Sequence, residues 1–302
     1  MSSATEVSRA FSSVVRRGPE LGYWRRSWRH LASNRLGIAM GLVIVFEFVV
    51  ALSAPLLSAY VLGYDASDQD LTHVFSSPNA THLLGTDQLG RDILTRLVYG
   101  AQVSLSVAFL TVAISATIGT TVGLTAGFYG GWFDTLLMRL VDTLLAIPAI
   151  FFFIMLSVLL RPGVLGLAVI IGSISWVGVA RLVRAEVLTT KHLDFVLAAR
   201  SVGVRNKRLM LRHILPAAFP VLLVAASLSV AQVVLAEAAL SFLGLGIQPP
   251  TPSWGNMISA AQTSFVRGIY LAVFPGIAIF ATVLAINVFG NALRDALDPK
   301  IA

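Results

Sequence analysis

The lysines, histidines and acids of this sequence are too few and too scattered to form a recognisable catalytic site. A P-loop needs Gly-x4-Gly-Lys-Ser/Thr, so that backbone N–H groups and the lysine side chain hold the phosphates. The chain has three lysines, Lys191, Lys207 and Lys300, and none of them follows a glycine. HExxH and GxSxG motifs are absent, and the histidines lack metal-ligand spacing. We therefore expect no catalytic residue, no bound cofactor and no metal in this chain.

Three acidic residues lie inside apolar runs of the sequence: Glu47, Asp142 and Glu237. A charge at the centre of a bilayer costs about 3 kcal/mol, so each is a candidate for a transport pathway or for helix packing. Glu47 can be protonated or paired with a neighbouring subunit. Asp142 can form an i,i+3 pair with Arg139. For Glu237, packing and the substrate path remain equal alternatives.

One basic stretch interrupts the apolar sequence: "AARSVGVRNKRLMLRHILP", residues 198–216. Just before and within it, four residues share one side of a helix: Phe195, Ala198, Ala199 and Val202. Gly203 permits a left-handed turn, and a second helical piece over 206–214 leads to Pro216, which the first turn of a helix tolerates. The pattern predicts a helix–turn–helix. An ordinary basic loop would explain the charge of this stretch but not its apolar face. We expect that face to pack against another protein surface.

The composition as a whole indicates a polytopic membrane protein. Of the 302 residues, 56% are hydrophobic and only 12% are charged, compared with about 25% charged in a soluble domain. The net charge of +7 is spread between apolar runs, unlike that of a nucleic-acid-binding domain. Because the chain has no cysteine, disulfides and thiolate metal sites are excluded.

Six apolar runs are long enough to cross a membrane. About 20 residues are needed to span a hydrocarbon core of about 30 Å. The predicted spans are 36–57, 103–128, 135–160, 164–188, 217–243 and 268–291. The first exceeds the length of a signal-peptide core and follows a long tail, so we expect an uncleaved anchor.

The distribution of Lys and Arg predicts the orientation, because cytoplasmic loops carry an excess of both. With the N-terminus inside, the inner segments hold 18 of the 22 Lys and Arg residues. The outer side holds four: Arg91, Arg96, Arg161 and Arg267. Both termini are therefore expected in the cytoplasm.

The first outer loop, residues 58–101, ends in a pattern that suggests a helix on the membrane surface. Thr86 can cap a helix start. Two acid-first i,i+4 pairs follow: Asp87 with Arg91, and Asp92 with Arg96. We expect an amphipathic helix along the outer interface, acting either as a structural elbow or as a landing surface for an external partner.

The third outer segment, residues 243–256, is rich in turn residues. Three prolines exclude a helix, and two glycines permit sharp turns. Trp254 suits a membrane–water boundary. The segment is interpreted as structural packing, with a gate element as the alternative.

These observations divide the chain into five parts. They are a basic cytoplasmic tail over 1–35, the first span over 36–57, the outer loop over 58–101, a five-helix core over 102–292 with a cytoplasmic loop at 190–216, and a C-terminal tail over 293–302.

The basic stretch resembles the "EAA loop" of bacterial ATP-binding-cassette (ABC) importer permeases, Glu-Ala-Ala-x3-Gly-x9-Ile-x-Leu-Pro. The matching residues are Ala198, Ala199, Gly203, Leu215 and Pro216. Leu197 replaces the usual glutamate, and His213 replaces the isoleucine. The resemblance implies that this segment, including Leu197, docks on an ATPase. It implies no salt bridge at position 197.

Three more segments, 82–105, 137–148 and 240–258, resemble the C-type permease subunit of the dipeptide/oligopeptide/nickel importer family. The resemblance runs from about residue 33 to the C-terminus. It implies the all-α, six-helix type I ABC importer permease fold in a bacterial inner membrane. It also implies a homologous B-type permease, ATP-binding subunits that use ATP and magnesium, and an external substrate-binding protein.

The favoured interpretation is the membrane subunit of a peptide importer whose ATPase is another chain. The main alternative is a secondary transporter that uses intramembrane acids such as Glu47 and Glu237. A membrane enzyme lacks any motif, and a channel lacks a filter-like segment. The sequence leaves open whether the cargo is a dipeptide, an oligopeptide, haem or nickel, and whether the two ATPase domains are fused.

Overall fold

The computed structural model describes residues 23–264 and 266–297, and over these ranges the chain is helical without a β-strand. The helices are α2 (Tyr23–Ser33), α3 (Arg35–Leu52), α4 (Ala54–Leu57), α5 (Ile93–Tyr129), α6 (Gly131–Leu145), α7 (Ala149–Leu160), α8 (Val164–Thr190), α9 (Asp194–Ser201), α10 (Asn206–Leu209), α11 (Leu215–Phe242), α12 (Trp254–Gln262) and α13 (Tyr270–Leu297). Two π-helical turns, η1 (Ser58–Leu62) and η2 (Met210–Ile214), continue α4 and α10. The all-α prediction is confirmed. Most of the tail predicted over 1–35, and Lys300, lie outside the described residues.

Five helices of the described part are long and apolar enough to cross a membrane, and the bent pair α6–α7 makes a sixth crossing if it is one span. These helices overlap the predicted runs, although α5 begins at Ile93 rather than at the predicted residue 103. The first run differs, because the chain bends at Ser53 and Pro55 then starts the short helix α4. The fifth is longer than predicted, since α10, η2 and α11 form one continuous helix over 206–242.

The third predicted span, 135–160, is not a single helix. Helix α6 ends at Leu145, α7 begins at Ala149, and the two meet at 78°. Pro148 causes the break, because proline lacks an N–H and disfavours helical backbone at the residue before it. Hydrophobicity alone therefore located this apolar segment correctly, but the prediction of one straight helix was wrong.

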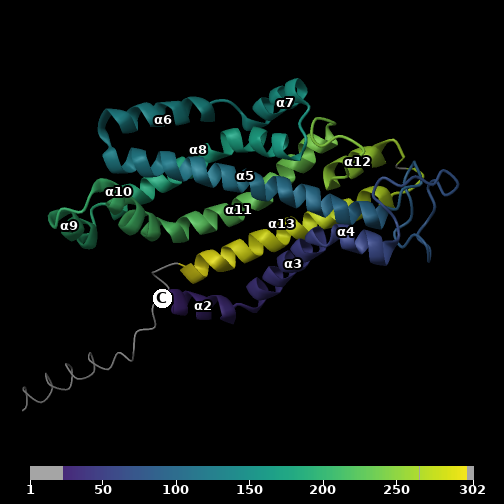
Figure 1. The fold of residues 1–302 in the computed structure, drawn as a ribbon, viewed down its shortest axis with the longest axis horizontal. Coiled ribbons are helices and arrows are strands. Elements are labelled where there is room, and N and C mark those ends of the chain that lie inside the picture. The colour runs from purple at the N-terminus through teal and green to yellow at the C-terminus, as the bar shows by residue number, and fades with distance from the viewer. Residues whose placement is uncertain (1–22, 265, 298–302) are drawn as a thin grey trace, which may run out of the picture.

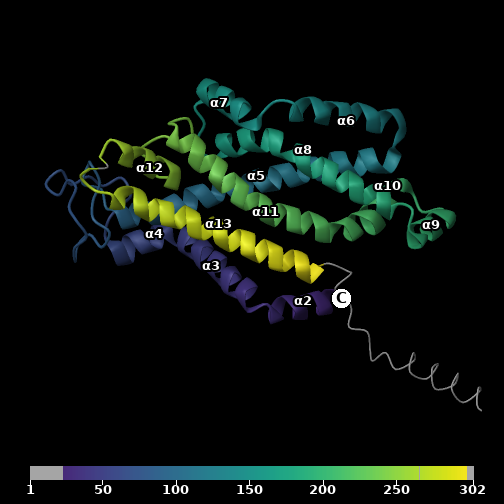
Figure 2. The same cartoon turned by 180° about the vertical axis from the view of Figure 1, so that it is seen from behind.

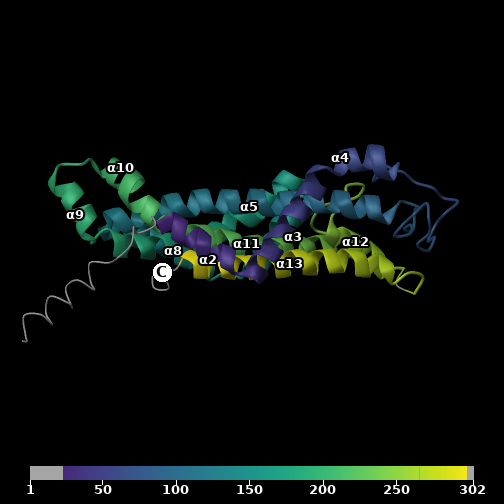
Figure 3. The same cartoon turned by 90° about the horizontal axis from the view of Figure 1, so that it is seen from below.

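The helices lie along one long axis with loops gathered at both ends (Figure 1). Helices α9 and α10 form one end, and α2 and the last turns of α13 lie towards the same end (Figures 1 and 2). Helix α12 and the loop between η1 and α5 form the opposite end. Seen along a perpendicular direction, the bundle is flat, and α3 crosses its face (Figure 3). The segment predicted to be cytoplasmic and the loop predicted to be outer are thus at opposite ends.

A stripe of glycines lets α5 and α8 pack backbone against backbone. Gly119, Gly123 and Gly127 recur every fourth residue on the side of α5 that faces α8. A Cβ atom on Gly123 would stand 2.4 Å from the carbonyl oxygen of Ala180. Small residues at this spacing are a common basis of helix association in membranes, because they allow close contact.

We expect Gly123→Val to destabilise the subunit by about 1–3 kcal/mol, the usual cost of overpacking a close contact. The measurement is the free energy of unfolding of the detergent-solubilised subunit. Gly178→Val in α8 is the matched control, because no atom lies within 4 Å of a Cβ there. Equal losses for the two variants would show that the contact with α8 is unimportant.

Candidate coupling segment and intramembrane acids

The basic stretch folds as the predicted helix–turn–helix. Helix α9 ends in a Schellman motif: the N–H of Gly203 donates to Arg200 O at 3.0 Å and the N–H of Val204 to Ala199 O at 3.2 Å. Gly203 has φ +82°, a left-handed conformation that glycine adopts without strain. Open space surrounds the position where its Cβ would be. The glycine is thus required by the turn and not by a close contact with the residues that the structure describes.

Helix α9 is fastened to the bundle along one side only. Three side chains of the segment are fully buried against α5 and α8: Val196, Leu209 and Ile214. The side chain of Arg200 also lies over the ring of Phe128 at 5.6 Å. These contacts fix the position of the segment relative to the bundle.

Most of the apolar face predicted for α9 is left uncovered by the described part of the chain. Phe195 is 47% exposed and Val202 is 84% exposed, and Ala198 is also exposed, whereas Ala199 is half-buried. We call Phe195, Ala198 and Val202 the coupling patch. Leu197, 42% exposed, lies on the other flank of α9. A partner can therefore contact the helix from both flanks.

Leu215 and Pro216 lie in the first turn of α11, directly after η2. Leu215 is half-buried against the core below α9, and Pro216 is exposed. No helical break separates them from α10. The chain is therefore helical without interruption from α10 into the fifth span.

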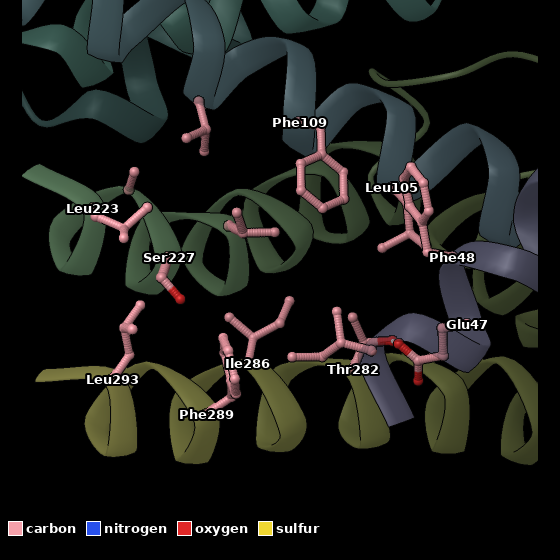
Figure 4. Close-up of a pocket in the computed structure, with 14 residues that line it drawn as sticks. Glu47, Phe48, Leu105, Phe109, Leu223, Ser227, Thr282, Ile286, Phe289 and Leu293 are labelled. Carbon is pink, nitrogen blue, oxygen red and sulfur yellow. The ribbon is translucent and has the colours of Figure 1, made fainter. Parts of the chain in front are cut away.

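Glu47 lines a cavity of about 360 Å³ between α3, α5, α11 and α13 (Figure 4). Its carboxylate accepts a hydrogen bond from the Thr282 hydroxyl at 2.9 Å. Glu47, Thr282 and Ser227 are the polar residues of the lining, and the others are apolar. Glu47 thus has a hydrogen-bond partner within its own chain. We call this space the α3 cavity.

Asp142 pairs with a residue other than the one expected. Its carboxylate binds Arg181 of α8, not Arg139 of its own helix. Nearby, Asp134 of α6 accepts two hydrogen bonds from Arg184 of α8, at 2.5 and 2.6 Å. The expectation of an i,i+3 pair with Arg139 was wrong, because α8 brings two arginines alongside α6. The acids of α6 therefore attach it to α8.

Glu237 is fully buried and joins three parts of the structure. Ser104 of α5 donates to its carboxylate at 2.8 Å, and Ser241 of α11 donates at 2.7 Å. The same two hydroxyls accept from the outer segment, from the N–H of Trp254 at 3.3 Å and that of Ile247 at 3.1 Å. Of the two alternatives, this geometry favours helix packing over the substrate path.

Trp254, expected to suit a membrane–water boundary, is packed inside the protein, and its depth relative to the membrane stays a prediction. It is 2% exposed, and its indole N–H donates to Leu97 O at 3.1 Å. It begins α12, a helix that sequence reasoning missed. The signal was a capping box, in which Ser253 and Asn256 each accept a hydrogen bond from the backbone N–H of the other.

The predicted surface helix of the first outer loop was wrong. Helix α5 begins at Ile93, and its N-cap is Asp92 rather than Thr86. The four charged residues of the two predicted pairs are buried: Asp87, Arg91, Asp92 and Arg96. The pair of Asp87 and Arg91 is present at 2.7 Å, but Arg96 donates to Ala66 O at 3.0 Å. The charges thus fasten the outer loop onto α5 instead of facing a membrane surface.

A metal centre is not evident in the part of the chain that the structure describes. No group of three or more histidines, acids or cysteines there could hold an ion. The candidate functional features are instead the α9–α10 segment, the α3 cavity and the two ends of the bundle.

These features agree with what family models recognise in the sequence. Residues 119–302 match the model described as "Binding-protein-dependent transport system inner membrane component". Residues 22–78 match the "N-terminal TM domain of oligopeptide transport permease C". The chain belongs to the family of ABC importer permeases with the type I fold. Such permeases are non-catalytic transport subunits.

Similar proteins cover nearly the whole chain. The glutathione transport system permease protein GsiD of Escherichia coli O6:K15:H31 (strain 536 / UPEC) is 40% identical over 279 residues, 92% of this chain and 91% of the relative. GsiD of Shigella flexneri serotype 5b (strain 8401) is 41% identical over the same length. A crystal structure of an amino acid ABC transporter with histidines has a TM-score of 0.51 at 17% identity, covering 67% of this chain and 94% of that chain. That likeness concerns the fold alone.

Proposed function

We propose that this chain is a membrane-spanning subunit of an importer for peptide-type substrates, driven by ATPase subunits that dock on α9. The observation that carries the proposal is α9 itself. It lies at one end of the bundle, is anchored through Val196, and leaves Leu197 and the coupling patch exposed. A group of exposed apolar side chains outside the spans is typical of a protein–protein interaction site.

The partners follow from the family and from the arrangement of the ends. A homologous B-type permease completes the pathway, ATP-binding subunits bind ATP and magnesium, and an external binding protein delivers the substrate. The complex lies in the bacterial inner membrane, with both termini and α9 of this chain in the cytoplasm. Support for this orientation comes from the basic residues and from α2 and the end of α13, which lie towards the α9 end.

Peptide-type cargo is supported by the similarity to permeases named for glutathione transport and oligopeptide transport. Glutathione is itself a small peptide with free carboxylates. Dipeptides and oligopeptides are therefore ranked before haem and nickel.

The mechanism uses the continuous helix that follows α9. ATP-driven closure of the ATPases moves α9, and the continuous helix of α10, η2 and α11 carries that movement into the bundle. At the outer half of α11, Glu237 connects it to α5 and to the outer segment. A switch requires contacts that differ between two states, and a docked helix supplies them.

Reconstitution of this chain with and without its B-type permease and ATPase tests the proposal. We expect peptide uptake only in the complete, ATP-supplied complex. Gradient-driven uptake by this chain alone would support a secondary transporter and overturn the proposal.

We expect Phe195→Ser and Leu197→Ser each to weaken ATPase binding roughly fivefold. Both side chains are about half exposed, and burying that remainder contributes about 1 kcal/mol. The measurement is the affinity of the detergent-solubilised permease pair for the ATPase. Leu71→Ser in the outer loop, 70% exposed, is the control and should change nothing. An effect of Phe195→Ser alone would mean that the ATPase contacts only one flank.

A further inference from the structure

A second cavity lies at the opposite end of the bundle from α9, between the end of α7 and the loop that follows α11. It has a volume of about 360 Å³, within the range of about 300–1,000 Å³ typical of small-molecule sites. Its lining consists of Ser157, Val158, Arg161, Gly244, Leu245 and Gln248. Three of these have polar side chains, unlike most of the lining of the α3 cavity. We call this space the outer cavity.

The polar groups of the outer cavity have unused hydrogen-bonding capacity. The hydroxyl of Ser157 is buried and lacks a hydrogen-bond partner in the described structure. Such groups are rare, because a buried hydroxyl without a partner loses its bonds to water. The amide nitrogen of Gln248 donates to Gly244 O at 2.8 Å and Gly246 O at 3.1 Å, which leaves its carbonyl oxygen as an acceptor.

Arg161 completes the set with a positive charge. Its side chain is exposed and forms no ion pair with any acid of the described residues. Its φ is +42°, at the end of α7 where glycine is the usual residue. A cation also offsets the dipole of a helix C-terminus. That explains a basic residue here, but not the unsatisfied hydroxyl beside it.

We propose that the outer cavity is a recognition site for the terminal carboxylate of the transported peptide. The guanidinium of Arg161 donates to the carboxylate, and the hydroxyl of Ser157 donates to it once a rotation about χ1 turns the buried oxygen into the cavity. The carbonyl oxygen of Gln248 accepts from a peptide N–H. Charge-assisted hydrogen bonds of this kind are among the strongest in proteins. The inference rests on the proposed function, because it requires peptide cargo arriving at this end.

The test compares two forms of one peptide, with a free C-terminal carboxylate and with a C-terminal amide, in proteoliposomes holding the complete transporter. For each form, the affinity of the binding protein is measured separately and the protein is kept saturated. Arg161→Gln should lower uptake of the free acid about tenfold and leave uptake of the amide unchanged. Arg161→Lys should restore part of the loss, and Ser157→Ala should show a smaller loss of the same kind. Arg267→Gln, which also removes an outer arginine, is the matched control.

The outcomes separate this inference from the proposed function. If the wild-type complex shows no ATP-driven peptide uptake, the proposed function is wrong and the recognition site with it. If wild-type uptake is normal and Arg161→Gln affects acid and amide equally, or behaves as Arg267→Gln does, only the recognition site is overturned. ATPase activity stimulated by the binding protein verifies that each variant is assembled.

Discussion

Gly203→Val is expected to lower ATP-driven uptake roughly 30-fold while leaving membrane insertion intact. At φ +82° a β-branched residue is strained by about 2 kcal/mol, which corresponds to a factor of about 30 in population. The space around the position is open, so a larger side chain meets no steric clash. The backbone strain is therefore relieved by a change in the orientation of α9. The docked geometry is therefore lost, and ATP hydrolysis is no longer coupled to uptake. The measurement is the ratio of peptide transported to ATP hydrolysed.

Gly63→Val is the matched control for this effect. Gly63 has φ +75° and equally open surroundings, but it follows η1 at the other end of the bundle. Similar backbone strain is thus introduced far from α9. The control should leave the ratio of transport to hydrolysis near that of the wild type. Normal transport by Gly203→Val would exclude α9 as the coupling element.

Glu237→Ala is expected to destabilise the subunit by about 3 kcal/mol. The substitution leaves a buried cavity and removes the acceptor for the hydroxyls of Ser104 and Ser241. Glu237→Gln keeps the volume and one oxygen acceptor, so it should cost about 1 kcal/mol. The measurement is the free energy of unfolding of the subunit in detergent micelles.

Glu186→Ala in α8 provides the comparison for the loss of a glutamate. That side chain is half-buried, and its carboxylate is 3.5 Å from the hydroxyl of Thr190. We expect a change of no more than about 0.5 kcal/mol there. If Glu237→Gln instead abolished uptake without loss of stability, Glu237 would belong to the substrate path and its packing role would be secondary.

The sequence was sufficient for the membrane class, the approximate location of the spans and the helix–turn–helix. Hydrophobic runs must be helical in lipid, because every backbone N–H and C=O needs an internal partner. The turn at Gly203 was readable because the left-handed conformation favours one residue type. These features depend on local chemistry, so they can be predicted without knowing which distant segments pack against them.

The pairings of the charged residues were decided only by tertiary structure. Asp142 pairs with Arg181 and not with Arg139. The charged residues at the end of the first outer loop are buried within the protein instead of facing a membrane surface. Helix spacing shows which residues of one helix are neighbours, but not which other helix lies beside them. The break at Pro148 could have been expected from the proline, though not its 78° angle.

Sequence patterns alone were enough to show that this chain spans a membrane and carries a basic helix–turn–helix with an apolar face. Three features emerged only from the three-dimensional arrangement: α9 is held through Val196 and exposed on both flanks, Glu237 is hydrogen-bonded between α5 and α11, and Ser157, Arg161 and Gln248 line one cavity. The physical reason is the same in each case. Burial and partner choice depend on segments distant in sequence, and no local pattern specifies which of them meet.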